Sequence, residues 1–165
     1  MKKSVMLLIS LFSLIAVCLV AFFGVFASNI VVTNYIQTID IRDMNGNEIP
    51  EVGGVKTLQI NFVEDMYDIE ADQSYMNYFL TVSLNEGLEE PSNPSVLYSV
   101  PENGYVTLNG ENAARNGALL IKERTSNPSI IITTISCYPN DGGSAKEDVV
   151  RLVIRCGDLI SYESE

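Results

Sequence analysis

From residue 35 onward, the chain is a series of short segments in which apolar and polar side chains alternate. In residues 55–63 (VKTLQINFV), Leu58, Ile60 and Phe62 fall on one face, which is typical of a strand with one buried side. Such segments predict strands at 35–42, 55–63, 78–84, 96–100, 104–108, 118–123, 129–138 and 148–155. Gly, Pro and Asn mark turns between them, so we expect an all-β sandwich or barrel, with no long helix after Ser28.

A second feature is the apolar run at residues 4–27, which contains no charged side chain and follows Lys2 and Lys3. As a helix it would be about 36 Å long, against a hydrocarbon core of about 30 Å. The two lysines favour a cytoplasmic N-terminus. We therefore expect one N-terminal transmembrane helix, a signal anchor in residues 1–28 that binds the cell membrane through residues 4–27, with the C-terminal domain extracytoplasmic.

Two other interpretations of this segment stay open. Val25-Phe26-Ala27 followed by Ser28 has the small residue that a signal peptidase requires, and a cleaved leader would make the protein secreted. Signal peptides usually carry an apolar region of only about 7–15 residues, so the length favours a retained anchor. Lipoprotein processing at Cys18 is least favoured, because Val17 is a poor residue before the cysteine and an apolar run follows.

The charges are distributed unevenly along the chain. All 21 Asp and Glu residues follow Ser28. Of the ten Lys and Arg residues, Lys2 and Lys3 precede it and eight follow it, so residues 29–165 have a net charge of 8 − 21 = −13. It repels phosphate backbones, and we expect no nucleic-acid partner. The chain is thus divided into a membrane anchor (1–28), a linker (29–34), a β-domain (35–157) and an acidic tail (158–165).

The stretch 93–110 (NPSVLYSVPENGYVTLNG) resembles the central motif of bacterial immunoglobulin-like (Ig-like) domains of group 2, the invasin- and intimin-related type. In that family Asn-Pro-Ser-Val is followed by Asn-Gly and then Val-Thr. The resemblance covers roughly residues 35–155 and implies an Ig-like β-sandwich, although only the central motif is specific. Two departures are the absence of the family's frequent Trp and a longer segment 110–129, which a hairpin insertion around 118–123 would explain.

Residue types that common catalytic sites need are missing from the chain. It has no His, which excludes Ser-His-Asp and Cys-His catalysis and removes the commonest metal ligand. It also lacks a dinucleotide-binding or Walker-type glycine motif and a Cys-x-x-Cys pair. We therefore expect no enzyme activity, no catalytic or cofactor-binding residues and no cofactor. The pair Asn103-Gly104 is best interpreted as a structural turn, because both residue types tolerate a left-handed backbone.

Two acidic clusters are weak candidates for a metal site. In the first, Asp43, Asn45 and Asn47 alternate like the first ligands of a calcium loop. The sixth position is Glu48 rather than Gly, and the twelfth is Gly54 rather than Glu, so a β-turn is the preferred interpretation.

The second cluster lies in residues 63–72 (VEDMYDIEAD), where Glu64, Asp65 and Asp68 are the candidate ligands. Five carboxylates in this short segment repel one another unless solvent or cations screen them. The preferred interpretation is a solvated loop beyond a strand end rather than a calcium site.

Cys137 and Cys156 lie in the last two predicted strands. If these strands form a hairpin about Asp141-Gly142, Cys137 lies opposite residues near Lys146, and Cys156 lies opposite the start of the preceding strand. A disulfide needs Cα atoms within about 7 Å. We therefore expect two free, mostly buried thiols.

These observations favour a non-enzymatic, membrane-anchored Ig-like module outside the cell, serving bacterial cell-surface adhesion or envelope interaction, with an unknown protein or glycan ligand. Tyr67, Tyr75 and Tyr78 near the second acidic cluster are candidate contact residues, although a sandwich core uses tyrosines too. The alternative is a small single-pass subunit of a membrane or envelope assembly, whose anchor packs against partners. An exported hydrolase is the weakest hypothesis, because no carboxylate spacing argues for a paired site.

Overall fold

The computed structural model describes residues 12–18, 33–110, 112–124 and 129–157. The chain divides into two compact units, Met1–Thr33 and Asn34–Glu165. In the first unit, residues 12–18 are helical. Among the described residues, no helix has both the length and the apolar character needed to cross a membrane. Most of the predicted membrane span and linker, and the predicted acidic tail 158–165, lie outside the described residues.

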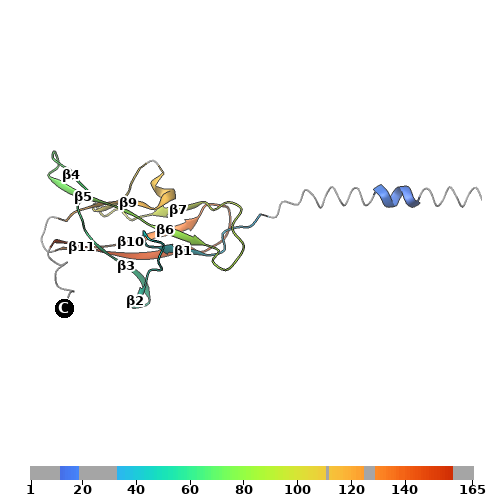
Figure 1. The fold of residues 1–165 in the computed structure, drawn as a ribbon, viewed down its shortest axis with the longest axis horizontal. Helices are drawn as coiled ribbons and strands as arrows, with labels where there is room; N and C mark the ends of the chain where they lie inside the picture. The colour runs from blue at the N-terminus through green and yellow to red at the C-terminus, as the bar shows by residue number, and fades with distance from the viewer. Residues whose placement is uncertain (1–11, 19–32, 111, 125–128, 158–165) are drawn as a thin grey trace, which may run out of the picture. The chain divides into compact units, whose positions relative to one another are not determined.

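The regular secondary structure of the second unit is almost entirely β-strand (Figure 1), which confirms the all-β prediction. The strands are β1 (Ile39–Arg42), β2 (Glu51–Val52), β3 (Val55–Asn61), β4 (Met66–Asp68), β5 (Gln73–Phe79), β6 (Thr81–Leu84), β7 (Val96–Ser99), β8 (Val106–Leu108), β9 (Ala118–Lys122), β10 (Ser129–Pro139) and β11 (Asp148–Cys156). A single helical turn, α2 (Ala113–Asn116), lies between β8 and β9.

The strands form three sheets. Five of them pair in the order β2-β3-β11-β10-β7, four pair in the order β4-β5-β9-β8, and β1 pairs with β6. Within the five-stranded sheet, β11 is antiparallel to β10 and parallel to β3. In Figure 1, β3, β10 and β11 run along one side of the unit, and β4, β5 and β9 run along the other.

The hydrophobic core is built from side chains of both larger sheets. On β11, Val150, Leu152 and Ile154 are completely buried, as their shared face predicts. They belong to one apolar cluster with Leu119 and Ile121 of β9. Because burial of apolar surface is the main stabilising term in folding, contact between these strands is the chief source of the unit's stability.

One predicted strand, 78–84, is in fact two strands in different sheets. β5 pairs with β9, whereas β6 pairs with β1, so the chain changes sheet at Leu80. The Leu80 N–H donates to the Gly117 carbonyl at 3.0 Å. Gly117 has φ +66, and a Cβ there would lie 2.8 Å from the Leu80 carbonyl oxygen, so only glycine fits. Apolar alternation continues through the crossing, and the pattern therefore does not reveal it.

Other element predictions are also corrected. β4 and the start of β5 form a hairpin where a solvated loop is predicted, and β9 is a central strand between β5 and β8 rather than part of an appended hairpin insertion. The predicted strand 35–42 begins only at Ile39. Before it, the backbone N–H groups of Ile36 and Gln37 donate to the side chains of Asp141 and Asn85 instead of to a neighbouring strand.

Candidate functional site

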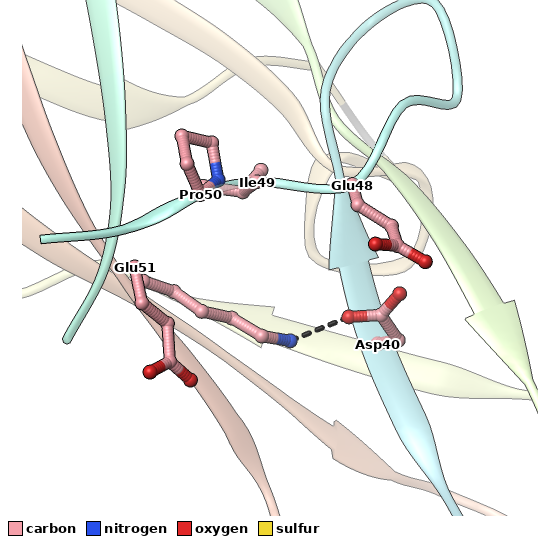
Figure 2. Close-up of a pocket in the computed structure, with 6 residues that line it drawn as sticks. Asp40, Glu48, Ile49, Pro50 and Glu51 are labelled. Carbon is pink, nitrogen blue, oxygen red and sulfur yellow. Dashed lines mark hydrogen bonds and ion pairs between the residues drawn. The ribbon is translucent and has the colours of Figure 1, made fainter. Parts of the chain in front are cut away.

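A cavity of about 600 Å³ opens beside β1 and β3 (Figure 2). It is lined by Asp40, Glu48, Ile49, Pro50, Glu51 and Lys56. Lys56 Nζ lies 2.5 Å from Asp40 Oδ1, the ion pair drawn as a dashed line in Figure 2, and 2.6 Å from Asp148 Oδ2. Asp148 Oδ2 also accepts a hydrogen bond from the Ile41 N–H at 2.7 Å. One lysine and two carboxylates therefore tie β1, β3 and β11 together.

The charges at this cavity are compensated within the fold. Burial alone would raise the pKa of Asp40. The hydrogen bonds and charges of Lys56 and Arg42 together outweigh this effect, so the pKa lies below its ordinary value. Burial lowers the pKa of Lys56, but Asp148 and Asp40 raise it above its ordinary value. Lys56 thus stays protonated at neutral pH and is not a nucleophile. The arrangement can stabilise the fold, and only Glu48 and Glu51 present exposed carboxylates at the cavity mouth.

The first predicted metal cluster is a hydrogen-bonded turn. The two Asp43 carboxylate oxygens accept hydrogen bonds from the N–H groups of Asn45 and Asn47, both at 2.8 Å, and from Asn47 Nδ2 at 3.0 Å. The hydrogen bond from the Asn47 side chain, with those from backbone N–H groups, lowers the pKa of Asp43. Gly46 has φ +80, as a tight turn requires. The loop's own donors therefore occupy the carboxylate that would have to bind a cation.

The second predicted cluster does not converge on one point. Glu64 Oε2 accepts a hydrogen bond from Ser74 Oγ at 2.8 Å, and Asp65 Oδ2 accepts one from the Asn77 N–H at 2.7 Å. Asp68 Oδ1 instead caps the turn that follows β4. The three carboxylates thus face three different partners, all of them neutral donors.

The β4–β5 hairpin (residues 66–75) exposes apolar side chains among these carboxylates. Met66 and Tyr67 are exposed, and Ile69 at the tip is 85% exposed. The Tyr67 hydroxyl donates to Asp72, and this hydrogen bond, followed by burial and the charges of neighbouring carboxylates, raises the pKa of Tyr67. The sequence analysis names Tyr67 as a candidate contact residue, but the loop interpretation does not include the exposed Met66 and Ile69. The signal in the sequence was three large apolar or aromatic side chains within one acidic segment.

The predicted tyrosine cluster is divided between surface and interior. Tyr67 is exposed on the hairpin. Tyr75 is partly exposed, and Tyr78 packs against the core, where burial raises its pKa. Of these three tyrosines, Tyr67 is therefore the one whose side chain is exposed for contact.

The turn at Asn103-Gly104 serves the fold. Asn103 Oδ1 accepts hydrogen bonds from the N–H groups of Tyr105 and Val106, both at 2.8 Å, and Asn103 Nδ2 donates to Thr133 Oγ1 at 2.9 Å. Gly104 has φ +75. The side chain thus fastens the start of β8 to β10, in agreement with the structural turn that the sequence predicts.

The cysteines lie as the sequence predicts. Cys156 pairs across the hairpin with Ser129, at the start of β10, and Cys137 pairs with Asp148, two residues beyond the predicted Lys146. Both thiols are free and buried. Burial raises the pKa of Cys137 to about 12, so this thiol is unreactive at neutral pH.

In comparisons with protein-family models, curated proteins and solved structures, the chain has no significant match. Within the part of the chain that the structure describes, no group of three or more Cys, Asp or Glu side chains is arranged to hold a metal ion. Function is therefore inferred from the chain's own surfaces: a charge-compensated cavity and an exposed acidic hairpin.

Proposed function

We propose that this chain is a membrane-anchored, extracytoplasmic module with an Ig-like β-sandwich that makes protein contacts through its β4–β5 hairpin. The observation that carries the contact role is the 85% exposure of Ile69 at the hairpin tip. An apolar side chain held in water gains free energy when a partner covers it. The surrounding carboxylates favour a partner surface that combines apolar and basic groups.

The strand pairing supports the Ig-like part of the proposal. Ig domains of the constant type place strands A, B, E and D in one sheet and C, F and G in the other. Here β4-β5-β9-β8, and β7-β10-β11 within the five-stranded sheet, follow this order if β4 is counted as A and β6 is left out. The strands β1 to β3, which precede β4, are additional to this count. Tyr98 on β7 is 3% exposed, and on this count it would correspond to the large buried aromatic residue of strand C.

The sequence of the first 28 residues supports the anchored part of the proposal. An apolar run of this length, preceded by Lys2 and Lys3, is typical of a signal anchor with a cytoplasmic N-terminus. The strand-rich unit receives its chain at Asn34, and the β4–β5 hairpin lies at the opposite end of this unit (Figure 1). A unit tethered through its N-terminus would thus hold the hairpin away from its point of attachment, where an external partner can reach it.

Cysteine labelling in intact cells tests the location. In a Cys18→Ser background, which removes the exposed native thiol, Ile69→Cys places a thiol at the exposed tip and Lys3→Cys places one before the apolar run. The other two native cysteines, Cys137 and Cys156, are buried. A membrane-impermeant maleimide is expected to label Ile69→Cys without permeabilisation and Lys3→Cys only afterwards. Labelling of Ile69→Cys only after permeabilisation would contradict the extracytoplasmic proposal.

Comparative cross-linking in membranes tests the contact role. Ile69→Asp is expected to lose cross-linked complexes that the full chain forms, because a charge replaces the apolar tip. Leu88→Asp is the matched control, since Leu88 is also exposed and lies in a turn outside the hairpin. Complexes that survive Ile69→Asp but disappear when residues 4–27 are replaced by an unrelated anchor would favour the alternative, a subunit assembled through its membrane helix.

A further inference from the structure

The outward face of β10 and β11 carries apolar side chains beside two arginines. Ile132 of β10 is 66% exposed and lies opposite Val153 of β11, while Ile130 lies opposite Arg155. Arg151 precedes Val153 by two residues and therefore lies on the same face of the sheet. We name the patch of Ile130, Ile132, Arg151, Val153 and Arg155 the Ile–Arg face.

Arg151 meets neutral hydrogen-bond acceptors on this face. Its guanidinium donates hydrogen bonds of 2.8 and 3.2 Å to Thr57 Oγ1 and one of 3.2 Å to the Val52 carbonyl oxygen. These acceptors are neutral, in contrast to the carboxylates of Asp40 and Glu86 that meet Arg42. The Ile–Arg face thus combines exposed apolar area with a cation whose hydrogen-bond partners carry no charge.

The β4–β5 hairpin also exposes apolar side chains, but the charged groups beside them are negative. Its exposed Met66, Tyr67 and Ile69 stand among carboxylates, and neutral donors hold Glu64, Asp65 and Asp68. Apolar groups on both surfaces and charges of opposite sign make the hairpin complementary to the Ile–Arg face.

We propose that the Ile–Arg face binds the β4–β5 hairpin of a second copy of this chain. The inference rests on the proposed contact role of the hairpin and deepens it by naming the partner. The net charge of −13 after Ser28 makes copies repel at long range, so we expect self-association to be weak in dilute solution. Confinement of anchored copies to one membrane would raise their local concentration and favour the contact.

The position of the two surfaces permits a reciprocal contact. The Phe62 N–H donates to the Arg155 carbonyl oxygen at 2.8 Å, and β4 begins four residues later at Met66. The base of the hairpin therefore lies near the Arg155 end of the Ile–Arg face. In a two-fold pair, each copy can place its hairpin on the face of the other, and such closed pairing is the commonest form of self-association.

Sedimentation of the full chain in detergent, over a range of protein concentrations, tests this proposal. Ile69→Asp on the hairpin and Ile132→Asp on the face are each expected to weaken self-association by roughly tenfold or more, as the loss of a buried isoleucine does. Leu88→Asp is the matched control and is expected to behave like the unmodified chain. All variants are compared for circular dichroism and unfolding midpoint, and both isoleucines are exposed enough that folding should be retained.

A charge exchange identifies the pairing directly. Glu70→Lys and Arg151→Glu are each expected to weaken self-association, and an equimolar mixture of the two is expected to restore complexes between unlike copies. Absence of self-association in the unmodified chain, or failure of the mixture to restore it, would overturn the proposal. An effect of Ile132→Asp without one of Ile69→Asp would also overturn it, and would assign the face to another occupant such as residues 158–165. Loss of membrane cross-links in Ile69→Asp, without self-association, would leave the proposed function standing.

Discussion

The two ends of the strand-rich unit are held in different ways. Where the chain enters, buried Asn85 accepts hydrogen bonds from the N–H groups of Gln37 and Thr38 and donates to the carbonyl oxygens of Tyr35 and Glu89. At the other end (Figure 1), the hairpin tip is held by hydrogen bonds between neighbouring residues, and its large side chains face solvent. The comparison indicates a firmly fastened base and a hairpin whose surface is available to a partner.

The largest expected difference between the ends concerns two residues with a left-handed backbone, Asn85 (φ 51) and Asp72 (φ 49). Asn85→Ala should destabilise the protein by about 3 kcal/mol, because it removes four part-buried hydrogen bonds to the backbone and leaves alanine at a strained φ. Asp72→Ala, on the exposed hairpin, should cost less than about 1 kcal/mol. Urea unfolding measures both. Asn85→Gly loses the same side-chain hydrogen bonds but adopts φ 51 without strain, so its difference from Asn85→Ala measures the backbone strain. Equal losses in Asn85→Ala and Asp72→Ala would contradict the difference between the two ends.

The next effect concerns the carboxylate that joins β1, β3 and β11. Asp148→Ala should cost about 2 kcal/mol, because it leaves the Ile41 N–H without its acceptor and removes one of the two anions that meet Lys56. Asp148→Asn retains an acceptor oxygen for Ile41 and should cost less. Urea unfolding at pH 7 separates the two variants, and an Asn variant as unstable as the Ala variant would show that the ion pair dominates.

The ion pair of Asp40 and Lys56 at the cavity should make the unfolding free energy fall at low pH. The pKa of Asp40 lies below its ordinary value of 3.8, so its contribution to stability is present above that value and is lost as the pH falls through the lower, folded-state pKa. The pKa of Lys56 lies above 10.5, so its contribution is present below pH 10.5 and is lost at higher pH. Asp40→Asn should therefore reduce the loss of unfolding free energy between pH 7 and pH 2.

Lys56→Met is the companion variant for this measurement. It removes the hydrogen bond and charge that do most to lower the pKa of Asp40, so it should reduce the acid dependence as well. Unchanged pH dependence in both variants would mean that other carboxylates cause the fall at low pH, with Asp43 the first to examine because its pKa is also lowered.

The sequence predicts the core better than it predicts how the strands are connected. Alternation places Val150, Leu152 and Ile154 on one face because a central strand buries a full row of side chains. It does not reveal the change of sheet at Leu80, since both strands that meet there bury side chains with the same period. Thr57 lies on the face opposite Leu58, a face that alternation alone would leave to solvent. It is buried, and its hydroxyl accepts hydrogen bonds from Arg151, which lies in a distant part of the chain.

The candidate surfaces differ in the same way: a feature made by neighbouring residues can be predicted from the sequence, and one made by residues far apart in the chain cannot. The turn at Asp43 is local, and Asn-Gly residues predict it. The β4–β5 hairpin has no buried face along β4, so period-two alternation is absent there and the segment resembles a loop. The Ile–Arg face requires the register of β10 against β11, and the hydrogen-bond acceptors of Arg151 come from β2 and β3, which sequence spacing does not specify.

The hairpin tip should contribute least to the stability of the fold. Ile69→Asp should change the unfolding free energy by no more than about 0.5 kcal/mol, because an exposed side chain at a hairpin tip loses little packing on substitution. Urea unfolding of the full chain gives the value, and Ile135→Asp, a buried core position on β10, provides the opposite extreme. If Ile69→Asp leaves the unfolding free energy unchanged but weakens self-association, Ile69 serves the contact and not the fold. A large loss of stability in Ile69→Asp would instead mean that the hairpin tip packs against its own unit.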